Sequence, residues 1–265
     1  MSDALLALAE SIAREAGAEL RSRFTQTRTV EFKGRDTDLV TDADRASEAI
    51  ILSRLQREVP THAVLAEESG AHDATGGFRW FVDPLDGTSN YAHGVPHFCV
   101  TLAVEDAQGL AAGVVFDPLR DECFAGLRGG GARCNGRMMA ASAVQTLDRA
   151  LLCTGFPYDV RERPERPLGL LGRLLTQAQG MRRLGSAALD LAYVAAGRFD
   201  GFFEFGLKPW DVAAGGLLVA EAGGVMRRLD GGVWTPLDGD VMASGALLAD
   251  ALGRECREFV ATLPR

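Results

Sequence analysis

Hydrophobic and polar positions alternate along this chain with two different periods, which together predict a mixture of helices and strands. Apolar residues at helical spacing predict helices at residues 3–24, 42–58, 166–178, 186–196 and 212–222. Short apolar runs between turn residues predict strands at residues 64–66, 78–83, 97–105, 111–117, 121–127, 151–153, 201–204 and 225–226. Strand and helix alternate in the second half of the chain. The patterns leave the order of the strands open.

Composition and charge favour a soluble enzyme. At 265 residues, of which 47% are hydrophobic, the chain can bury a large core, as one domain or as two closely joined halves. The net charge of −8 disfavours binding to nucleic acid or to anionic membranes. No apolar run approaches the roughly 20 residues of a membrane span, and the N-terminal pattern is not that of a signal peptide, so we expect a cytoplasmic protein.

The segment Trp80–Asn90 carries the strongest chemical signal, because two carboxylates follow an apolar strand. Pro84 fixes its own φ, so we predict a sharp turn after Asp83 that brings Asp83 and Asp86 to the same side. Gly87 lets a ligand approach the backbone, and Thr88-Ser89-Asn90 can start a helix whose free N–H groups attract anions. This turn could hold a cation against a phosphate. A plain surface turn is the alternative.

Further acids occur in three other segments. After the apolar run Val64–Ala66, one of Glu67 and Glu68 should face the site, although glutamates are also common at solvated strand ends. Thr41 and Asp44 match a helix capping box, which by itself could explain both residues. Asp211 opens a later helix, where it could bind a cation or simply cap the helix.

Magnesium chemistry explains a gathering of such acids. Mg²⁺ prefers near-octahedral oxygen ligands at about 2.0–2.1 Å and is usually held by a few carboxylates with substrate phosphate and water. Carboxylates packed together repel one another, and a cation relieves that repulsion. A metal also lowers the pKa of water, which can then attack phosphorus. These residues therefore favour metal-assisted hydrolysis of a phosphate ester.

At this point the chain resembles the inositol monophosphatase family of Mg²⁺-dependent, lithium-sensitive phosphatases. Four separate motifs carry the resemblance: Asp38–Asp44, Ala66–Ser69, Trp80–Tyr91 and Trp210–Gly215. A fifth stretch, Gly185–Arg198, is similar to the bacterial branch of inositol-1-monophosphatases. The similarity extends from Lys33 to about Gly224, and it departs from the usual family pattern at Ala66 and Ser89, neither of which removes a ligand.

The resemblance implies two or three Mg²⁺ ions. The first would be held by Glu67, Asp83 and the carbonyl of Leu85, the second by Asp83, Asp86 and Asp211, and a weaker third would lie near Glu67. The leaving alkoxide would be stabilised by the second ion.

The resemblance also implies the catalytic and substrate-binding residues. Thr88, polarised by Asp44, would orient the attacking water without a phosphoenzyme. Phosphate would contact the N–H groups of Gly87 and Thr88. The hydroxyls of the substrate would contact Asp86, Gly185, Ser186, Ala187 and Glu204. Lys33 lies where the family has a basic residue near the site, although it could equally be a solvated lysine.

For the fold, the resemblance implies the α+β class and the layered αβαβα sandwich of the inositol monophosphatase and fructose-1,6-bisphosphatase type. Residues 1–265 would form one domain with two α/β halves, about 1–145 and 146–265, and the active site would lie between them. The resemblance further implies a homodimer that acts on a small phosphorylated polyol. Sister phosphatases that act on histidinol phosphate, a 3′-phosphonucleotide or fructose bisphosphate are alternatives. A binding partner of the transcription machinery is another, because a bacterial member of the family acts in antitermination.

Several other features carry less weight. His93 and His97 have a spacing found in zinc sites, but Gly94 and Pro96 argue against a continuous helix between them. Arg182-Arg183 could contact phosphate or belong to a solvated face or a subunit contact. We expect a hairpin turn at Gly129–Gly131 and a mobile surface loop at Pro157–Pro167. The odd number of cysteines, with no close pairs, predicts buried free thiols: Cys99, Cys123, Cys134, Cys153 and Cys256.

Overall fold

The computed structural model describes residues 2–26, 29–32 and 39–264. The helices are α1 (Ser2–Arg23), α2 (Asp42–Glu58), α3 (Thr88–Ala92), α4 (Glu165–Leu175), α5 (Ala187–Ala195), α6 (Pro209–Glu221) and α7 (Ala249–Val260), with a 3-10 turn η1 (Leu147–Arg149). The strands of the first half are β1 (Val30–Phe32), β2 (Leu39–Thr41), β3 (Ala63–Ala66), β4 (Gly70–His72), β5 (Arg79–Asp86), β6 (Cys99–Asp106), β7 (Gly109–Asp117), β8 (Glu122–Leu127), β9 (Gly131–Cys134) and β10 (Arg137–Met138). Those of the second half are β11 (Leu151–Thr154), β12 (Gly180–Arg182), β13 (Gly201–Glu204), β14 (Gly224–Arg228) and β15 (Val241–Gly245).

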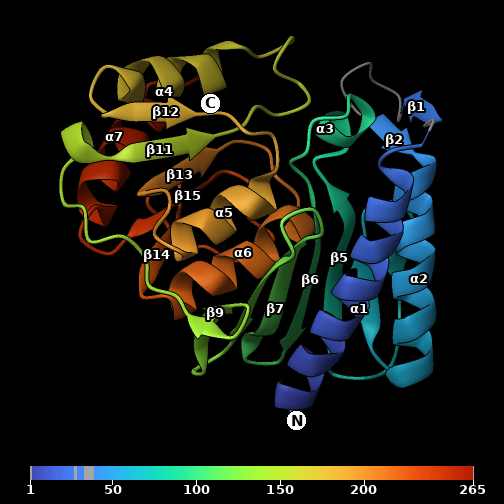
Figure 1. The fold of residues 1–265 in the computed structure, drawn as a ribbon. Coiled ribbons are helices and arrows are strands. Elements are labelled where there is room, and N and C mark those ends of the chain that lie inside the picture. Colours follow the sequence, from blue (N-terminus) through green and yellow to red (C-terminus); the bar gives the residue numbers. More distant parts are fainter. Residues whose placement is uncertain (1, 27–28, 33–38, 265) are drawn as a thin grey trace.

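Two mixed sheets form the frame of the molecule (Figure 1). The larger sheet has the strand order β10-β9-β8-β7-β6-β5-β3-β4, and only the pairing of β3 with β5 is parallel in it. The smaller sheet has the order β12-β11-β13-β15-β14, with β11 parallel to both of its neighbours. A short antiparallel pair, β1 and β2, stands apart from both sheets.

Helices cover the sheets in three layers. Helices α1 and α2 pack on one face of the larger sheet, α5 and α6 lie between the two sheets, and α4 and α7 cover the outer face of the smaller sheet. The expected αβαβα sandwich is therefore confirmed. The larger sheet is built from residues 63–138 and the smaller from residues 151–245. The division of the chain into halves at about residue 145 stays a prediction.

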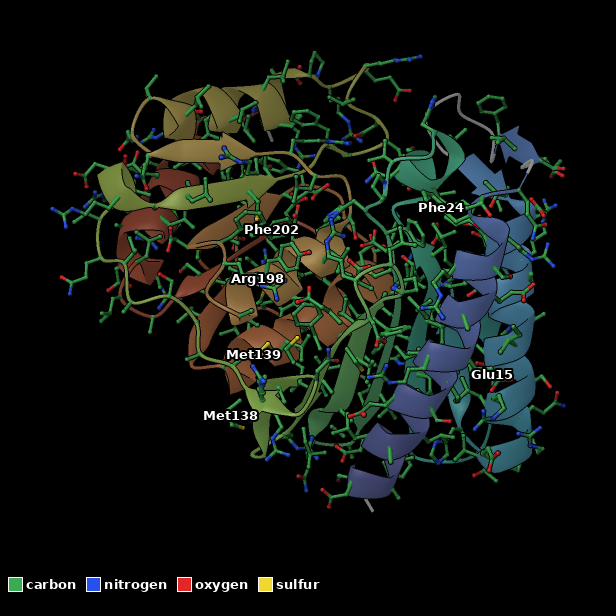
Figure 2. The ribbon with its side chains drawn as sticks, in the orientation of Figure 1. Glu15, Phe24, Met138, Met139, Arg198 and Phe202 are labelled. Carbon is green, nitrogen blue, oxygen red and sulfur yellow. The ribbon has the colours of Figure 1, made fainter. Side chains whose placement is uncertain are left out.

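The alternation of side chains along the strands explains the layers. In β5, Trp80 and Val82 pack toward α1 and α2, whereas Phe81 packs toward α5 and α6. In β13, Phe202 joins the core between the sheets and Phe203 joins the core under α4 and α7 (Figure 2). Each sheet therefore buries both faces, which accounts for continuous apolar runs in place of a simple polar alternation.

Small residues allow α6 to lie between two sheets and against α5. A Cβ atom on Gly215 would come within 2.5 Å of Leu191 Cβ on α5, and a Cβ atom on Gly113 of β7 would lie 3.0 Å from the Cα of Ala214. The buried residues of α6, from Val212 to Val219, leave no face of the middle of this helix to solvent. The close approach therefore depends on residues without bulky side chains.

Most elements expected from the sequence are confirmed, with shifted ends. The helix expected at 212–222 begins at Pro209, since proline is well suited to the first helical position. The sequence patterns did not predict β1, β2, β4, β9, β10, β12, β15 or α7. The hairpin turn at Gly129–Gly131 is confirmed by the antiparallel pairing of β8 with β9.

Other expectations can be compared with the structure as well. All five cysteines are free thiols, as expected, although Cys134 is only partly buried. Part of the loop expected at Pro157–Pro167 forms the first turn of α4, and the mobility of this segment stays a prediction. No helix among the described residues is long and apolar enough to cross a membrane.

The packing of α6 makes a prediction about two glycine-to-alanine substitutions. Gly215→Ala should destabilise the protein by about 1–3 kcal/mol, because its new methyl group would overlap Leu191. Gly172→Ala is the matched control, because it also lies inside a helix but has open space where its new methyl group would lie. It should stabilise the protein by about 0.5–1 kcal/mol through better helix propensity. Urea unfolding of both variants measures the difference, and equal effects would contradict the packing described.

Candidate active site

Strand β5 carries two acids of the candidate site to one side of the larger sheet. Asp83 pairs with Thr101 and Asp86 pairs with Cys99, so the two residues of β5 between these pairs lie opposite one residue of β6. This β-bulge puts Asp83 and Asp86 on the same face, although residues three apart on a regular strand point to opposite faces. The expectation of a sharp turn after Asp83 was therefore wrong. Pro84, which cannot donate a ladder hydrogen bond, lies within the bulge.

Hydrogen bonds fix the acids of the bulge. The Leu85 N–H donates to Asp83 Oδ1 at 2.9 Å, and the Ser47 hydroxyl donates to the carbonyl of Pro84 at 2.7 Å. Asp86 Oδ2 accepts hydrogen bonds from the Ser186 hydroxyl at 2.6 Å and from the Ala188 N–H at 2.8 Å. Asp86 thus ties the larger sheet to the N-terminus of α5, where Ser186 is the N-cap.

Thr88 and Asp44 form a hydrogen-bonded pair beside the bulge. The Thr88 hydroxyl lies 3.1 Å from Asp44 Oδ1 and 3.1 Å from the carbonyl of Leu85, and its single proton can serve one of them at a time. The other oxygen of Asp44 accepts hydrogen bonds from the N–H and the hydroxyl of Thr41, which completes the expected capping box. Asp44 therefore both caps α2 and contacts Thr88.

Burial changes the acidity of Asp44. Desolvation raises its pKa to about 6, although the hydrogen bonds from Thr41 and Thr88 act in the opposite direction. The charge of Glu67 raises the pKa of Asp44 further. Glu67 follows β3, and its N–H donates to the carbonyl of Val82 on β5 at 3.1 Å, which holds it beside the bulge.

Three of the predicted metal ligands are acids that repel one another, of which Asp83 is buried and Asp86 and Asp211 are partly buried at the cleft. Burial raises the pKa of Asp83 well above its usual value, and the charges of Glu67, Asp86 and Asp211 raise it further. Burial and the charges of Asp86 and Glu67 likewise raise the pKa of Asp211. Burial also raises the pKa of Asp86, against the effect of its hydrogen bonds from Ser186 and Ala188. The four acids are thus close enough to interact strongly.

Three acids of this cluster have no basic partner among the described residues. Within the described parts of the chain, Asp83, Asp86 and Asp211 form no ion pair with lysine or arginine. In their present positions, the His, Cys, Asp and Glu side chains of the described residues also form no group of three or more that could hold a metal ion. Asp211 accepts a hydrogen bond from the Lys208 N–H at 2.7 Å, so in this position it caps α6. The donor set fits a hard cation in charge and atom type, provided that these side chains reorient around it.

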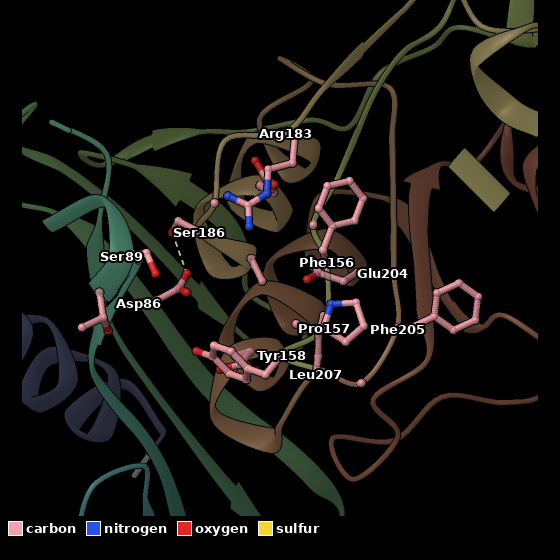
Figure 3. A pocket seen from close by; sticks show the side chains of 18 residues that line it. Asp86, Ser89, Phe156, Pro157, Tyr158, Arg183, Ser186, Glu204, Phe205 and Leu207 are labelled. Carbon is pink, nitrogen blue, oxygen red and sulfur yellow. Dashed lines mark hydrogen bonds between the residues drawn. The ribbon is translucent and has the colours of Figure 1, made fainter. Parts of the chain in front are cut away.

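A cleft opens beside the acids, between β5 and α3 on one side and the second half of the chain on the other (Figure 3). Its lining includes Asp211 and all the residues expected to bind the substrate: Asp86, Gly87, Thr88, Gly185, Ser186, Ala187 and Glu204. Glu67, Asp83, Leu85 and Asp44 do not line the cleft, and Asp83, Leu85 and Asp44 are buried behind it. Lys33 and Asp38 lie outside the described residues.

Gly87 allows the two sides of the cleft to meet. Gly87 has a φ of +97°, and a Cβ atom there would lie 3.0 Å from the carbonyl of His97 and 3.3 Å from that of Gly185. Asn90 of α3 donates hydrogen bonds of 2.8 Å to the carbonyls of His97 and Leu184, which joins the same two segments. Only a residue without a side chain fits between these carbonyls at position 87.

The sequence patterns missed several residues of the cleft. Gly155 lies against Glu204, whose carboxyl oxygens would be 2.3 Å from a Cβ atom at position 155. Asp190 lines the cleft from α5, and Phe156 lines it too. Arg183, one of the two arginines that the sequence assigned either to phosphate or to a solvated face or subunit contact, also lines the cleft, with its guanidinium 5.6 Å from the ring centre of Phe156. The stretch Gly185–Arg198 stands out by its resemblance to bacterial inositol-1-monophosphatases, but only the folded chain shows that Asp190 reaches the cleft.

The fold and the cleft together define a class of proteins: layered αβαβα proteins with a carboxylate-rich site between two sheets. The model of the inositol monophosphatase family matches residues 1–261, and the chain belongs to this family of phosphatases.

Two named relatives resemble the chain over most of its length. "Nus factor SuhB" of Salmonella typhimurium is 44% identical over 220 residues, which are 82% of each chain. "Inositol-1-monophosphatase" of Synechocystis sp. is 44% identical over 218 residues, which are 82% of this chain and 76% of the relative.

Solved structures show the same fold. Inositol monophosphatase from Anabaena (Nostoc) sp. PCC 7120 has a TM-score of 0.87 at 39% identity, covering 99% of this chain and 97% of that one. An IMPase/NADP phosphatase complexed with Mg²⁺ and phosphate has a TM-score of 0.78 at 25% identity, covering 89% of this chain and 88% of that one.

The repulsion between the buried acids makes a prediction about stability. A carboxyl whose pKa is raised in the folded state binds its proton more tightly than in the unfolded chain, so stability is lost as pH rises through that pKa. In protein freed of metal with a chelator, Asp83→Asn should be as stable as the wild type near pH 4 and more stable at pH 8. We expect a rise in Tm at pH 8 of at least about 2–4 °C, the effect of about 1 kcal/mol in a chain of this size.

The control for this measurement is Asp148→Asn, which removes an exposed carboxylate outside the site. Its Tm should follow that of the wild type at both pH values. A lower Tm for Asp83→Asn at pH 8 would show that Asp83 is stabilised by its neighbours and not repelled by them.

Proposed function

We propose that this phosphatase hydrolyses phosphate monoesters of small polyols with Mg²⁺, and that myo-inositol 1-phosphate is its substrate. The observation that supports the proposal best is the group of acids Asp83, Asp86 and Asp211, which repel one another and have no basic partner among the described residues. The name of the relative from Synechocystis supports the substrate, and the solved complex with Mg²⁺ and phosphate supports the metal.

The proposed metal ligands are the acids on β5 and those that lie beside it. Glu67, Asp83 and the carbonyl of Leu85 would hold one ion, Asp83, Asp86 and Asp211 a second, and a third would lie near Glu67. When bound, such ions supply positive charge against the phosphate and lower the pKa of water.

Thr88 and Asp44 are the proposed catalytic residues. If the Thr88 hydroxyl donates its proton to Asp44 Oδ1, the lone pairs of its oxygen face away and can accept a hydrogen bond from water. Asp44 performs this role as a carboxylate, which its pKa of about 6 permits at neutral pH. Thr88 would then position the water for attack on phosphorus.

The remaining residues of the cleft would bind the substrate. The N–H groups of Gly87 and Thr88 would contact the phosphate, and the hydroxyls of the alcohol would contact Asp86, Glu204 and the backbone from Gly185 to Ala187. We further propose that the protein is a cytoplasmic homodimer and is inhibited by lithium, as the resemblance implies.

A phosphate-release panel tests the proposed function. We expect the highest kcat/KM on myo-inositol 1-phosphate, compared with histidinol phosphate, a 3′-phosphonucleotide and fructose bisphosphate, and no activity in excess chelator. Asp83→Asn should lower kcat by at least about 100-fold. Even the substitution of a residue that only hydrogen-bonds a metal ligand typically lowers activity by about 10–100-fold. Thr88→Val keeps the shape of the side chain without the hydroxyl and should cost about 10²–10⁴-fold.

Asp148→Asn serves as the control variant in the same assay and should keep wild-type activity. Full activity in chelator would contradict the role of the metal. A panel in which myo-inositol 1-phosphate is the poorest substrate would assign the protein to one of the sister phosphatases.

A second role is supported by the name of the relative from Salmonella, "Nus factor SuhB". We propose that this protein also binds the transcription machinery through a surface separate from the cleft. Such a surface would not need the acids of the active site.

A pull-down that compares the wild type with Asp83→Asn separates the two roles. We expect both proteins to retain the same transcription elongation proteins, identified by mass spectrometry, although only the wild type hydrolyses substrate. Recovery of no transcription protein by either would count against the second role.

A further inference from the structure

Asp190 is a buried acid of the cleft that the proposed mechanism does not use. It lies on α5, is 1% exposed, and belongs to the lining of the cleft. Its Oδ1 atom is buried without a hydrogen-bond partner, and none of the described residues donates a hydrogen bond to its side chain. Buried carboxyl groups in folded proteins are almost always paired, so this one calls for a partner from outside the chain.

The charges around Asp190 narrow the choice of partner. Burial raises the pKa of Asp190 well above its usual value, the charge of Asp86 raises it further, and Arg183 acts in the opposite direction. The charge of Asp190 in turn raises the pKa of Glu204, which is also buried. A phosphate group would be repelled by Asp190 and Glu204 together. A neutral group that both donates and accepts hydrogen bonds would not.

A hydroxyl has these properties. It donates to a carboxylate and accepts from a protonated carboxyl, so it can satisfy Asp190 in either state. Glu204 and Asp190 come from different elements, β13 and α5, and both line the cleft. Gly155, whose lack of a side chain makes room for the carboxyl of Glu204, keeps this part of the cleft open. Two carboxyls at different positions can distinguish a phosphate ester whose alcohol part carries further hydroxyls from an ester whose alcohol part carries no further hydroxyl.

We propose that Asp190 binds a hydroxyl of the alcohol part of the substrate and selects phosphate esters of polyols over esters that lack further hydroxyls. This inference rests on the proposed phosphatase function of the cleft and assigns it a specificity residue. Sites built to hydrogen-bond a substrate hydroxyl discriminate strongly against analogues that lack it, because a buried polar group is then left unpaired.

The test compares two substrates in three proteins: wild type, Asp190→Ala and Asp190→Asn. With Asp190→Ala we expect kcat/KM for myo-inositol 1-phosphate to fall by about 10- to 100-fold, and that for phenyl phosphate, which has no further hydroxyl, to change by less than about threefold. Asp190→Asn, which can still donate and accept hydrogen bonds, should recover most of the loss. Asp148→Ala is the matched control and should leave both values unchanged.

Equal losses on the two substrates would overturn the proposal, because they would indicate a structural role for Asp190. Unchanged values on both would overturn it as well. The Tm of each variant is measured alongside, and Asp190→Asn, which keeps the shape of the side chain, provides the comparison if Asp190→Ala does not fold.

Binding of free myo-inositol separates this proposal from the proposed function, because it needs no catalysis. We expect myo-inositol to raise the Tm of the wild type more than that of Asp190→Ala. If no phosphate ester is hydrolysed but this difference is found, the phosphatase function fails and the role of Asp190 stands. An equal response of the two proteins to myo-inositol, including no response from either, overturns the role of Asp190 whether or not the protein is a phosphatase.

Discussion

Electrostatic repulsion among closely placed carboxylates is the constraint on which the rest of this site depends. Asp83, Asp86 and Asp211 come from two halves of the chain and are held by main-chain N–H groups near one another and near Glu67. Such an arrangement costs stability unless protons or cations neutralise it. We infer that these carboxylates are placed together to bind a ligand. The stability of the rest of the molecule must offset the cost of their repulsion.

The layered fold supplies both the stability and the geometry. Three apolar cores fill the spaces between the five layers, and the acids lie at the edge of the central one, where β5 meets the N-termini of α5 and α6. The hydrogen bond from Ser186 to Asp86 joins the larger sheet to the N-terminus of α5, the helix that lies between the two sheets. Asp190 and Glu204 line the cleft from the second half of the chain, and under the proposed function a change of such residues would combine the same phosphate chemistry with a different alcohol.

The sequence predicts the layered fold and the identity of the acidic residues better than it predicts how these acids are positioned. Pro84 predicts that Asp83 and Asp86 share a side, but the bulge opposite Thr101 and Cys99 depends on the neighbouring strand and cannot be read from one segment. Asp44 is ambiguous between a cap and a site residue because it is in contact with both Thr41 and Thr88, which are far apart in sequence. Gly155 and Asp190 acquire their places only through tertiary contacts. Strand β15 was missed because its residues Val241–Gly245 include alanine, serine and glycine, which give no strong strand pattern.

The most direct measurement of the central claim is a crystal structure of the protein soaked in Mn²⁺, which substitutes for Mg²⁺ and is located by its anomalous scattering. The account predicts anomalous peaks between Asp83 and its neighbours Glu67, Asp86 and Asp211, with the carboxylates turned toward the ions. Peaks elsewhere on the surface, or none while the acids keep their hydrogen bonds to Leu85, Ala188 and Lys208, would contradict it.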